Sequence, residues 1–202
     1  MAYKLIEGGG VTTPKGFLAG ACYVGVKSRK SEKPDVAIIY SEQPASCAAM
    51  FTTNKFCAAP VILDREILKK GKARAVVINS GNANAATGEQ GIKDAKTVET
   101  EAEKLLGLGE DEVFVCSTGV IGQKLPVEKV LEGVRRIVPD MSVEKGTDAA
   151  WAIMTTDLVK KEVAYELELS GGTIRIGACA KGSGMIHPNM ATMLAYITTD
   201  AK

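Results

Sequence analysis

The sequence predicts a mixed α and β fold, and three features indicate it. Short apolar runs rich in Val, Ile and Ala alternate with stretches that have helical spacing. Of the 202 residues, 46% are hydrophobic, which is enough for one sizeable core or two small ones. Alternating runs flank "LSGG" at 169–172 and predict an antiparallel hairpin, so the sheet is expected not to be purely parallel.

The strand candidates are short apolar runs of the kind that pack well in a sheet. The run "NMATMLAYI" at 189–197 also has the composition of a strand. The other candidates, in chain order, are 19–26, 36–40, 74–78, 112–116, 162–168 and 173–179.

Three helices are predicted. The most regular covers 89–106, where apolar residues recur at helical spacing and Gly107 follows as a stop. A second helix runs over 127–138, between two prolines that favour its start and its end. A third extends from about Val143 through Met154, with Gly146 near its start. No repeat or low-complexity linker forces a domain boundary, and the region 139–143 is where one could be hidden.

Composition and charge exclude several function classes. The 25 basic and 24 acidic residues give a net charge of +1 without long runs of one sign, so no nucleic-acid partner is expected. No segment reaches the roughly 18 apolar residues of a membrane span, and no signal peptide is visible, which predicts a cytoplasmic protein with no membrane partner. Five widely spaced cysteines and one histidine, His187, suit neither a disulfide framework nor a zinc site, and no metal site is expected.

Three polar loops follow predicted strands, which is where functional sites collect. The first, "NSGNANAATG" at 79–88, offers backbone N–H groups and the side chains of Asn79, Asn82 and Asn84 to a polar ligand. The same residue types are what ordinary turns require, so both interpretations stay open. None of the loops fits a phosphate-binding motif.

The second loop, "CSTGVIGQ" at 116–123, places Thr118 next to Gly119. A hydroxyl and a backbone N–H at one point can stabilise a developing oxyanion, and glycine permits close approach of a substrate. A tight turn between a strand and a helix is the alternative interpretation.

The third loop, "KGSGMIHPNMAT" at 181–192, ends on Thr192. A threonine hydroxyl needs a nearby base to act as a nucleophile, and its own α-amine serves when the residue is first in a chain. That requires cleavage of the Ala191–Thr192 bond; otherwise Thr192 is an ordinary strand residue. His187 is either a base for a neighbouring hydroxyl or a polar loop residue, and Lys181 either a solvated charge or a group that holds a carboxylate.

Four motifs occur together in this order: "NSGNANA" at 79–85, "CSTGVIG" at 116–122, "AIMTTD" at 152–157 and "KGSGMIHPNMATMLAYITTD" at 181–200. They closely resemble the ornithine acetyltransferase family of arginine biosynthesis, also called glutamate N-acetyltransferases. The resemblance runs from about residue 5 to the end of the chain. It implies a layered αββα sandwich with a mixed sheet, of the type shared with a class of aminopeptidases and similar to N-terminal-nucleophile hydrolases.

The resemblance also implies an activity and the residues that perform it. Members of the family transfer an acetyl group from N-acetylornithine to glutamate through an acetyl-threonine, and some accept acetyl-CoA as donor; no cofactor is implied. Thr192 would be the nucleophile after cleavage at Ala191–Thr192, and Thr118 and Gly119 the oxyanion hole. The substrate-binding positions would be Thr155, Lys181 and Thr192, whereas His187 matches no essential position.

The chain departs from the family in its length. Residues 1–191 would form the α chain as a single α/β domain, and 192–202 only the start of the β chain, whose remainder supplies further substrate-binding groups. The implied partner is therefore its own β chain, in an αβ heterodimer that assembles into a heterotetramer. Two alternatives remain: a self-cleaving amidase or aminopeptidase on the same fold, and a non-catalytic assembly subunit.

Overall fold

The computed structural model describes residues 2–27, 33–185 and 193–202. Its elements form two four-stranded sheets, which we call sheet A (order β1-β6-β7-β8) and sheet B (order β2-β3-β4-β5). The strands are β1 Ala2–Leu5, β2 Phe17–Cys22, β3 Val36–Ser46, β4 Lys72–Asn82, β5 Val113–Val120, β6 Lys161–Leu169, β7 Gly172–Lys181 and β8 Leu194–Thr199. The helices are α1 Ala59–Leu68, α2 Gly88–Leu106, α3 Val127–Ile137 and α4 Gly146–Ala152, with 3-10 turns at Val138–Asp140 and Val143–Lys145.

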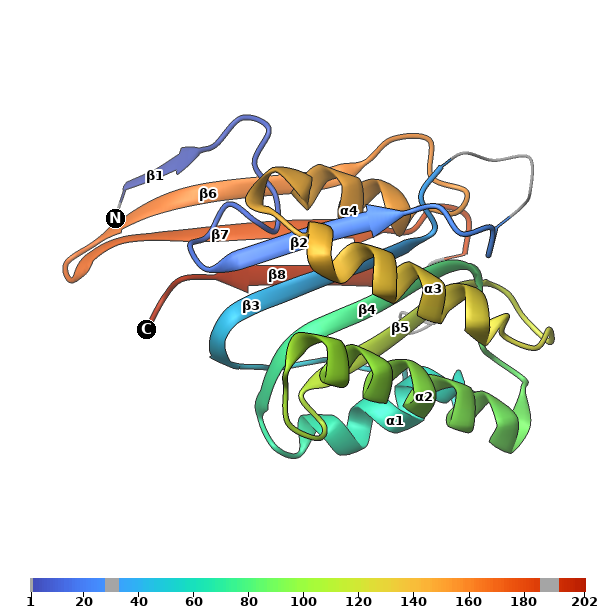
Figure 1. Ribbon diagram of the computed structural model, residues 1–202. Coiled ribbons are helices and arrows are strands. Elements are labelled where there is room, and N and C mark those ends of the chain that lie inside the picture. Colours follow the sequence, from blue (N-terminus) through green and yellow to red (C-terminus); the bar gives the residue numbers. More distant parts are fainter. Residues whose placement is uncertain (1, 28–32, 186–192) are drawn as a thin grey trace.

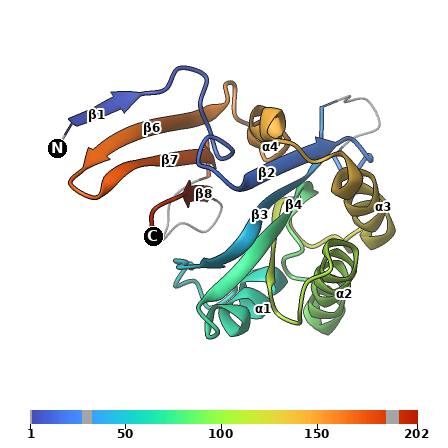
Figure 2. The same ribbon diagram turned by 60° about the vertical axis from the view of Figure 1, so that its left-hand side comes forward.

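The two sheets and the helices form successive layers. Sheet A, sheet B and the pair α2 and α3 follow one another across the molecule, and α4 lies near β2 and β6 (Figure 1, Figure 2). In the described part of the chain, no helix lies over the outer face of sheet A (Figure 2). The predicted layered α/β sandwich is confirmed, and of its two outer helical layers the described residues form the one that covers sheet B.

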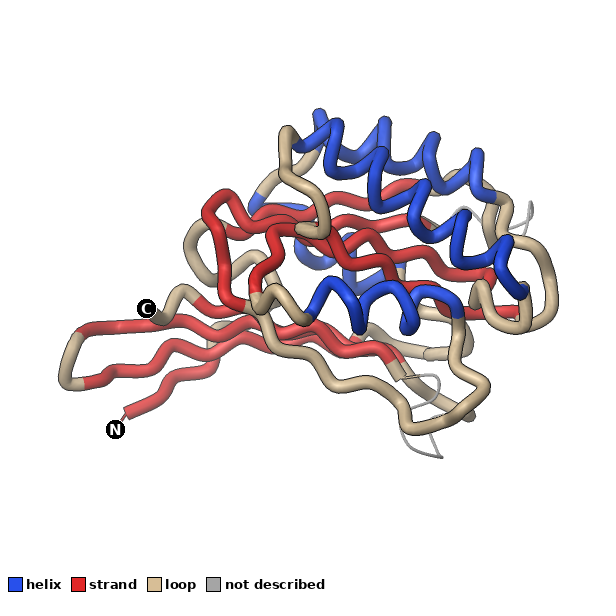
Figure 3. Tube along the Cα trace, turned by 90° about the horizontal axis from the view of Figure 1, so that it is seen from below, coloured by secondary structure: helices blue, strands red, loops and turns tan. Residues whose placement is uncertain are grey.

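The pairing of the strands makes sheet B mixed and sheet A antiparallel. In sheet B, β2 pairs with β3 and β3 with β4 in antiparallel register, whereas β4 and β5 run parallel. In sheet A, β6 and β7 form the predicted hairpin about the turn at 170–171, and it projects beyond the helices (Figure 3). Strand β8 adds to β7, so residues 194–199 fold as part of the same sheet as the residues before them.

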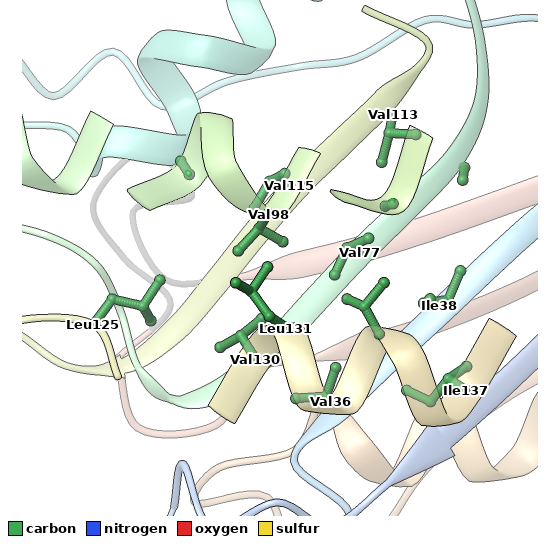
Figure 4. Close-up of a cluster of buried hydrophobic side chains, with 14 of the residues drawn as sticks. Val36, Ile38, Val77, Val98, Val113, Val115, Leu125, Val130, Leu131 and Ile137 are labelled. Atoms are coloured by element: carbon green, nitrogen blue, oxygen red, sulfur yellow. The ribbon is translucent and has the colours of Figure 1, made fainter. Parts of the chain in front are cut away.

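The core lies on both faces of sheet B. Val36 and Ile38 of β3 face α2 and α3, while Ala37 and Ile39 face the second core cluster, on the side of sheet A and α4. Because both faces are covered, the strand is a continuous apolar run and not an alternating one. Figure 4 shows the first cluster, in which valines of the sheet meet Val98 of α2 and Ile137 of α3.

The six strands predicted between residues 19 and 179 and the first two predicted helices are confirmed, with some differences at their ends. The strand-like run at 189–197 lies partly outside the described residues, and β8 begins within it at Leu194. The third helix is shorter than predicted: 143–145 is a 3-10 turn, and α4 covers only Gly146–Ala152. Gly146 lies so close to Thr12 that a Cβ would come within 2.3 Å of the threonine Oγ1, which explains a glycine at the start of a helix. Strand β1 and helix α1 were not predicted.

Helix α1 escaped prediction because its sequence pattern is weak. It begins at Ala59 with Pro60 in its first turn, and its buried residues include Asp64, while Ile62 is 43% exposed. An acid on the buried face and an apolar residue on the exposed face mask the helical period. Among the described residues, no helix has both the length and the hydropathy needed to cross a membrane.

Candidate active site

A cleft of about 2380 Å³ lies between the two sheets, lined by residues of β3, β4 and β5 on one side, of β8 on the other, and by much of the segment 47–58. Its lining includes the predicted residues Thr118, Gly119, Thr155 and Lys181, which come from three separate motifs. Thr118 and Gly119 lie at the carboxyl end of β5, and Lys181 is the last residue of β7. The structure therefore brings together the described residues that the sequence singled out for catalysis and substrate binding.

Lys181 and Thr118 join the two sheets inside the cleft. The Lys181 Nζ donates a hydrogen bond to the Thr118 Oγ1 at 3.1 Å, and both side chains are buried, with 5% of each residue exposed. Burial lowers the pKa of Lys181 below its ordinary value, although the charge of Asp157 partly offsets this, and Lys161 lowers the pKa further. An ammonium in this position can attract an anionic substrate group and polarise the threonine hydroxyl.

Gly119 has a conformation that demands glycine. Its φ is +138°, and a Cβ on this residue would lie 2.3 Å from the carbonyl carbon of Gly81 on the paired strand β4. Gly81 is just as confined, because a Cβ there would lie 2.6 Å from the Cα of Lys27. The two glycines let β4, β5 and residue 27 approach closely beside Thr118.

The asparagine side chains at 79, 82 and 84 donate hydrogen bonds to backbone carbonyls of the protein itself. The Asn79 Nδ2 donates to the Asn82 carbonyl at 2.9 Å, and the Asn82 Nδ2 donates to the carbonyls of Gln123 and Lys124. The Asn84 Nδ2 donates to the Gly91 carbonyl at 2.8 Å, with Asn84 in the left-handed region at a φ of 45°. These hydrogen bonds favour a structural role of the asparagines over ligand binding. The predicted loop is shorter than expected, because residues 79–82 form the end of strand β4 and only 83–87 connect it to α2.

Thr155 lies exposed at the rim of the cleft, two residues before a buried acid. Its N–H donates to the Asp157 Oδ2 at 3.4 Å, and the Gly182 N–H donates to the Oδ1 of the same carboxylate at 2.8 Å. Lys161 completes the set with an ion pair to Asp157. The motif "AIMTTD" thus contains a second residue, Asp157, that contacts the backbone beside the predicted substrate-binding positions.

The proposed cleavage bond lies outside the described residues. Ala191, Thr192 and His187 all fall within 186–192, so their predicted roles remain predictions. The described residues on either side, Met185 and Met193, both line the cleft.

Two further titratable groups at the cleft, Lys27 and Asp64, were not predicted from the sequence. Lys27 donates from its Nζ to the carbonyls of Pro34 and Ala152, and burial lowers its pKa to about 8 against an opposing effect of Asp35. Asp64 of α1 accepts the Val115 N–H at 3.0 Å, and burial raises its pKa to about 8. Neither belongs to a motif, because each is brought to the cleft by packing between distant segments.

In this layered α/β sandwich, the cleft between the sheets is lined by a threonine hydroxyl, a confined glycine and a buried ammonium. These groups define a class of protein suited to acyl chemistry. Comparison with known proteins then gives the family: the ArgJ family model matches residues 18–202. A bifunctional arginine biosynthesis protein ArgJ from Caldanaerobacter subterraneus subsp. tengcongensis is 54% identical over 193 residues, covering 96% of this chain and 47% of the relative. The chain belongs to the ArgJ family.

Solved structures agree with this assignment. The crystal structure of the bifunctional ArgJ protein from Bacillus halodurans matches with a TM-score of 0.86 and 41% identity, covering 94% of this chain and 98% of that one. Ornithine acetyltransferase from Mycobacterium tuberculosis, in complex with ornithine, matches with a TM-score of 0.82 and 39% identity, covering 96% and 100% of the two chains. The present chain spans about half the length of the curated relatives it matches.

Proposed function

We propose that the complete protein transfers the acetyl group of N-acetylornithine to glutamate, giving ornithine and N-acetylglutamate. One observation carries the proposal: in a chain of the ArgJ family, the Lys181 Nζ lies 3.1 Å from the Thr118 Oγ1, next to the confined Gly119, in the intersheet cleft. The relatives named above as bifunctional ArgJ and as an ornithine acetyltransferase bound to ornithine support the choice of substrates.

The proposed reaction has two half-reactions. The Thr192 hydroxyl attacks the acetyl carbonyl of N-acetylornithine and passes its proton to the freed α-amine of the same residue. The C–N bond breaks, ornithine takes that proton on its amine, and the acetyl group stays on Thr192 as an ester. The amine of glutamate then attacks the ester, and N-acetylglutamate leaves as the threonine hydroxyl regains a proton.

The described residues support the charge that develops in these steps. The Thr118 hydroxyl and the Gly119 N–H receive the oxyanion of each tetrahedral intermediate, while Lys181 and Thr155 bind the substrate. The same hydroxyl of Thr192 first attacks the Ala191 carbonyl, which breaks the peptide bond, frees the α-amine and leaves an ester that water hydrolyses. Cleavage and transfer thus use one nucleophile and one oxyanion site.

The remaining parts of the proposal concern partners and surroundings. The α chain, residues 1–191, pairs with the β chain that starts at Thr192, and the αβ heterodimer associates into a heterotetramer. No cofactor is required, acetyl-CoA is a second acetyl donor for glutamate, and the protein works in the cytoplasm. Neither a nucleic acid nor a membrane takes part.

An assay of the complete gene product tests the proposal. Ornithine release from N-acetylornithine should continue over many turnovers only when glutamate is present, with one N-acetylglutamate formed for each ornithine. Release of free acetate at the same rate without glutamate would instead identify an amidase. Absence of turnover in the complete product, with the Ala191–Thr192 bond intact, would identify a non-catalytic assembly subunit.

A further inference from the structure

We infer that Asp157 is a positioning residue that sets the spacing of Thr155 and Lys181 across the cleft. The inference rests on the proposed function, in which these two residues bind the substrate. It concerns a residue that has no role in that function as stated above.

The first argument is the set of contacts that Asp157 makes. Its Oδ2 accepts the Thr155 N–H at 3.4 Å, and its Oδ1 accepts the Gly182 N–H at 2.8 Å. One carboxylate therefore links the loop after α4 to the end of β7, next to Lys181. A carboxylate that accepts a backbone N–H makes a bond about twice as strong as a neutral one, and by its length the bond to Gly182 is the stronger of the two.

The second argument is the conformation of the backbone at Gly182. Its φ is +157°, within the region that favours glycine, and its N–H is directed to Asp157. This hydrogen bond fixes the backbone immediately after Lys181. The position of the Lys181 ammonium, and of its hydrogen bond to Thr118, follows from the same backbone.

The third argument is charge. Asp157 is 7% exposed and is paired with Lys161, whose side chain is 45% exposed. Burial raises the pKa of Asp157, but the hydrogen bonds from Lys161, Gly182 and Thr155 outweigh it, and the pKa is lowered overall. The carboxylate is thus ionised at neutral pH and faces Lys181 as a negative charge.

The pKa of Lys181 provides a measurement that distinguishes this role from a purely structural one. The groups that act on its charge are Asp157, Lys161 and Lys27, and Thr118 accepts its hydrogen bond. Asp157 raises the pKa of Lys181 and Lys161 lowers it. Removing one or the other charge should therefore move the titration of Lys181 in opposite directions.

The experiment compares four variants of the complete gene product: Asp157→Ala, Asp157→Asn, Lys161→Gln and, as a matched control, Asp148→Asn on the exposed face of α4. We expect Asp157→Ala to lose roughly 10²-fold in kcat/KM for N-acetylornithine, since a small misplacement of binding groups has that effect. Asp157→Asn keeps an acceptor for the Gly182 N–H and should lose less. Lys161→Gln should lose less still, and Asp148→Asn should match the wild type.

The pH profile of kcat/KM completes the test. Its alkaline limb should shift to lower pH in Asp157→Asn and to higher pH in Lys161→Gln. Hydrogen exchange at the Gly182 amide should quicken in Asp157→Ala, with thermal melting used to confirm that each variant is folded.

The outcomes separate the inference from the proposed function. If the wild type transfers acetyl groups, the inference alone would be overturned by an unchanged kcat/KM in Asp157→Ala. It would also be overturned if the alkaline limb shifted in the same direction in Asp157→Asn and Lys161→Gln. A wild-type protein that transfers nothing overturns the proposed function. Unchanged exchange at Gly182 in Asp157→Ala overturns the inference whether or not the protein is active.

Discussion

The Thr118 side chain has two tasks at the scale of single residues. It accepts a hydrogen bond from the buried ammonium of Lys181, and in the proposed reaction it receives the oxyanion. A buried ammonium is expensive unless it is hydrogen-bonded, so the threonine stabilises the folded state as well as the transition state. Both tasks depend on the hydroxyl and not on the methyl group.

Substitution of Thr118 separates the hydroxyl from the shape of the residue. Thr118→Val should lower kcat for acetyl transfer by roughly 10²- to 10³-fold and destabilise the fold by about 1–3 kcal/mol, because one acceptor of a buried charge is lost. Thr118→Ser keeps the hydroxyl and is the matched control. Steady-state kinetics and thermal melting measure the two effects, and equal activity of the two variants would contradict the assigned role.

Asp64 predicts a pH dependence of stability. Its pKa rises on folding from the ordinary 3.8 to about 8, chiefly through burial, with the Val115 N–H opposing and Glu99 adding to the shift. The folded protein therefore holds a proton that the unfolded chain has released between these values. This carboxyl makes the folded state progressively less stable as the pH rises through that window, by about 1.4 kcal/mol per unit of pKa difference at most.

Asp64→Asn removes that proton and keeps an acceptor for the Val115 N–H. The melting temperature of Asp64→Asn relative to the wild type should therefore be higher at pH 8 than at pH 5. Thermal melts of the complete gene product across this range provide the measurement. Parallel curves for the two proteins would show that Asp64 is ionised in the folded state.

At the scale of elements, α3 serves stability and not the site. Ile137 at its end is 2% exposed and packs in the cluster on the face of sheet B that α2 and α3 cover (Figure 4). Of the described residues that line the cleft, none belongs to α3. Burial of such a side chain contributes about 1.5–3 kcal/mol.

Truncation of Ile137 should consequently affect folding alone. Ile137→Ala is expected to destabilise the protein by about 2–5 kcal/mol, because it removes packed methyl groups and leaves a cavity. The KM and kcat of the remaining folded protein should stay at their wild-type values. Glu132→Ala, on the exposed side of the same helix, is the control, and a change in KM for Ile137→Ala alone would contradict this division.

Some helices and strands can be predicted from the sequence, and others cannot. The helix at 89–106 and the strand at 36–40 were predicted because each has a regular pattern, helical spacing in one and a continuous apolar run in the other. Helix α1 was not, because Asp64 lies on its buried face. Local pattern fails where a polar residue is buried through contacts with a distant strand.

The candidate site also has residues that the sequence predicted and residues that it did not. The motifs, together with the family resemblance, predicted that Thr118, Gly119 and Lys181 act together, and the structure places all three in one cleft. Gly81 and Asp157 were not predicted, because both act through backbone contacts between segments far apart in the sequence. Such contacts leave no spacing that a reader of the sequence could recognise.

At the scale of the whole molecule, the layers separate stability from chemistry. The helix pair and sheet B lie on one side of the molecule and share a core (Figure 2). The cleft lies between the two sheets, and the ends of β5 and β7 are part of its lining. Strand β8, just after the proposed cleavage bond, is part of sheet A, so residues on the two sides of that bond are held in one sheet. A threonine freed by cleavage would then stay with the site that it serves.

The central claim is that Thr192 becomes the first residue of a chain and carries the acetyl group. The most direct measurement is the intact mass of the complete gene product before and after incubation with N-acetylornithine. Two chains should be found, with the second starting at Thr192, and that chain should gain one acetyl group that glutamate then removes. A Thr192→Ala protein that still splits and still transfers acetyl groups, or an acetyl group found only on the first chain, would contradict the claim.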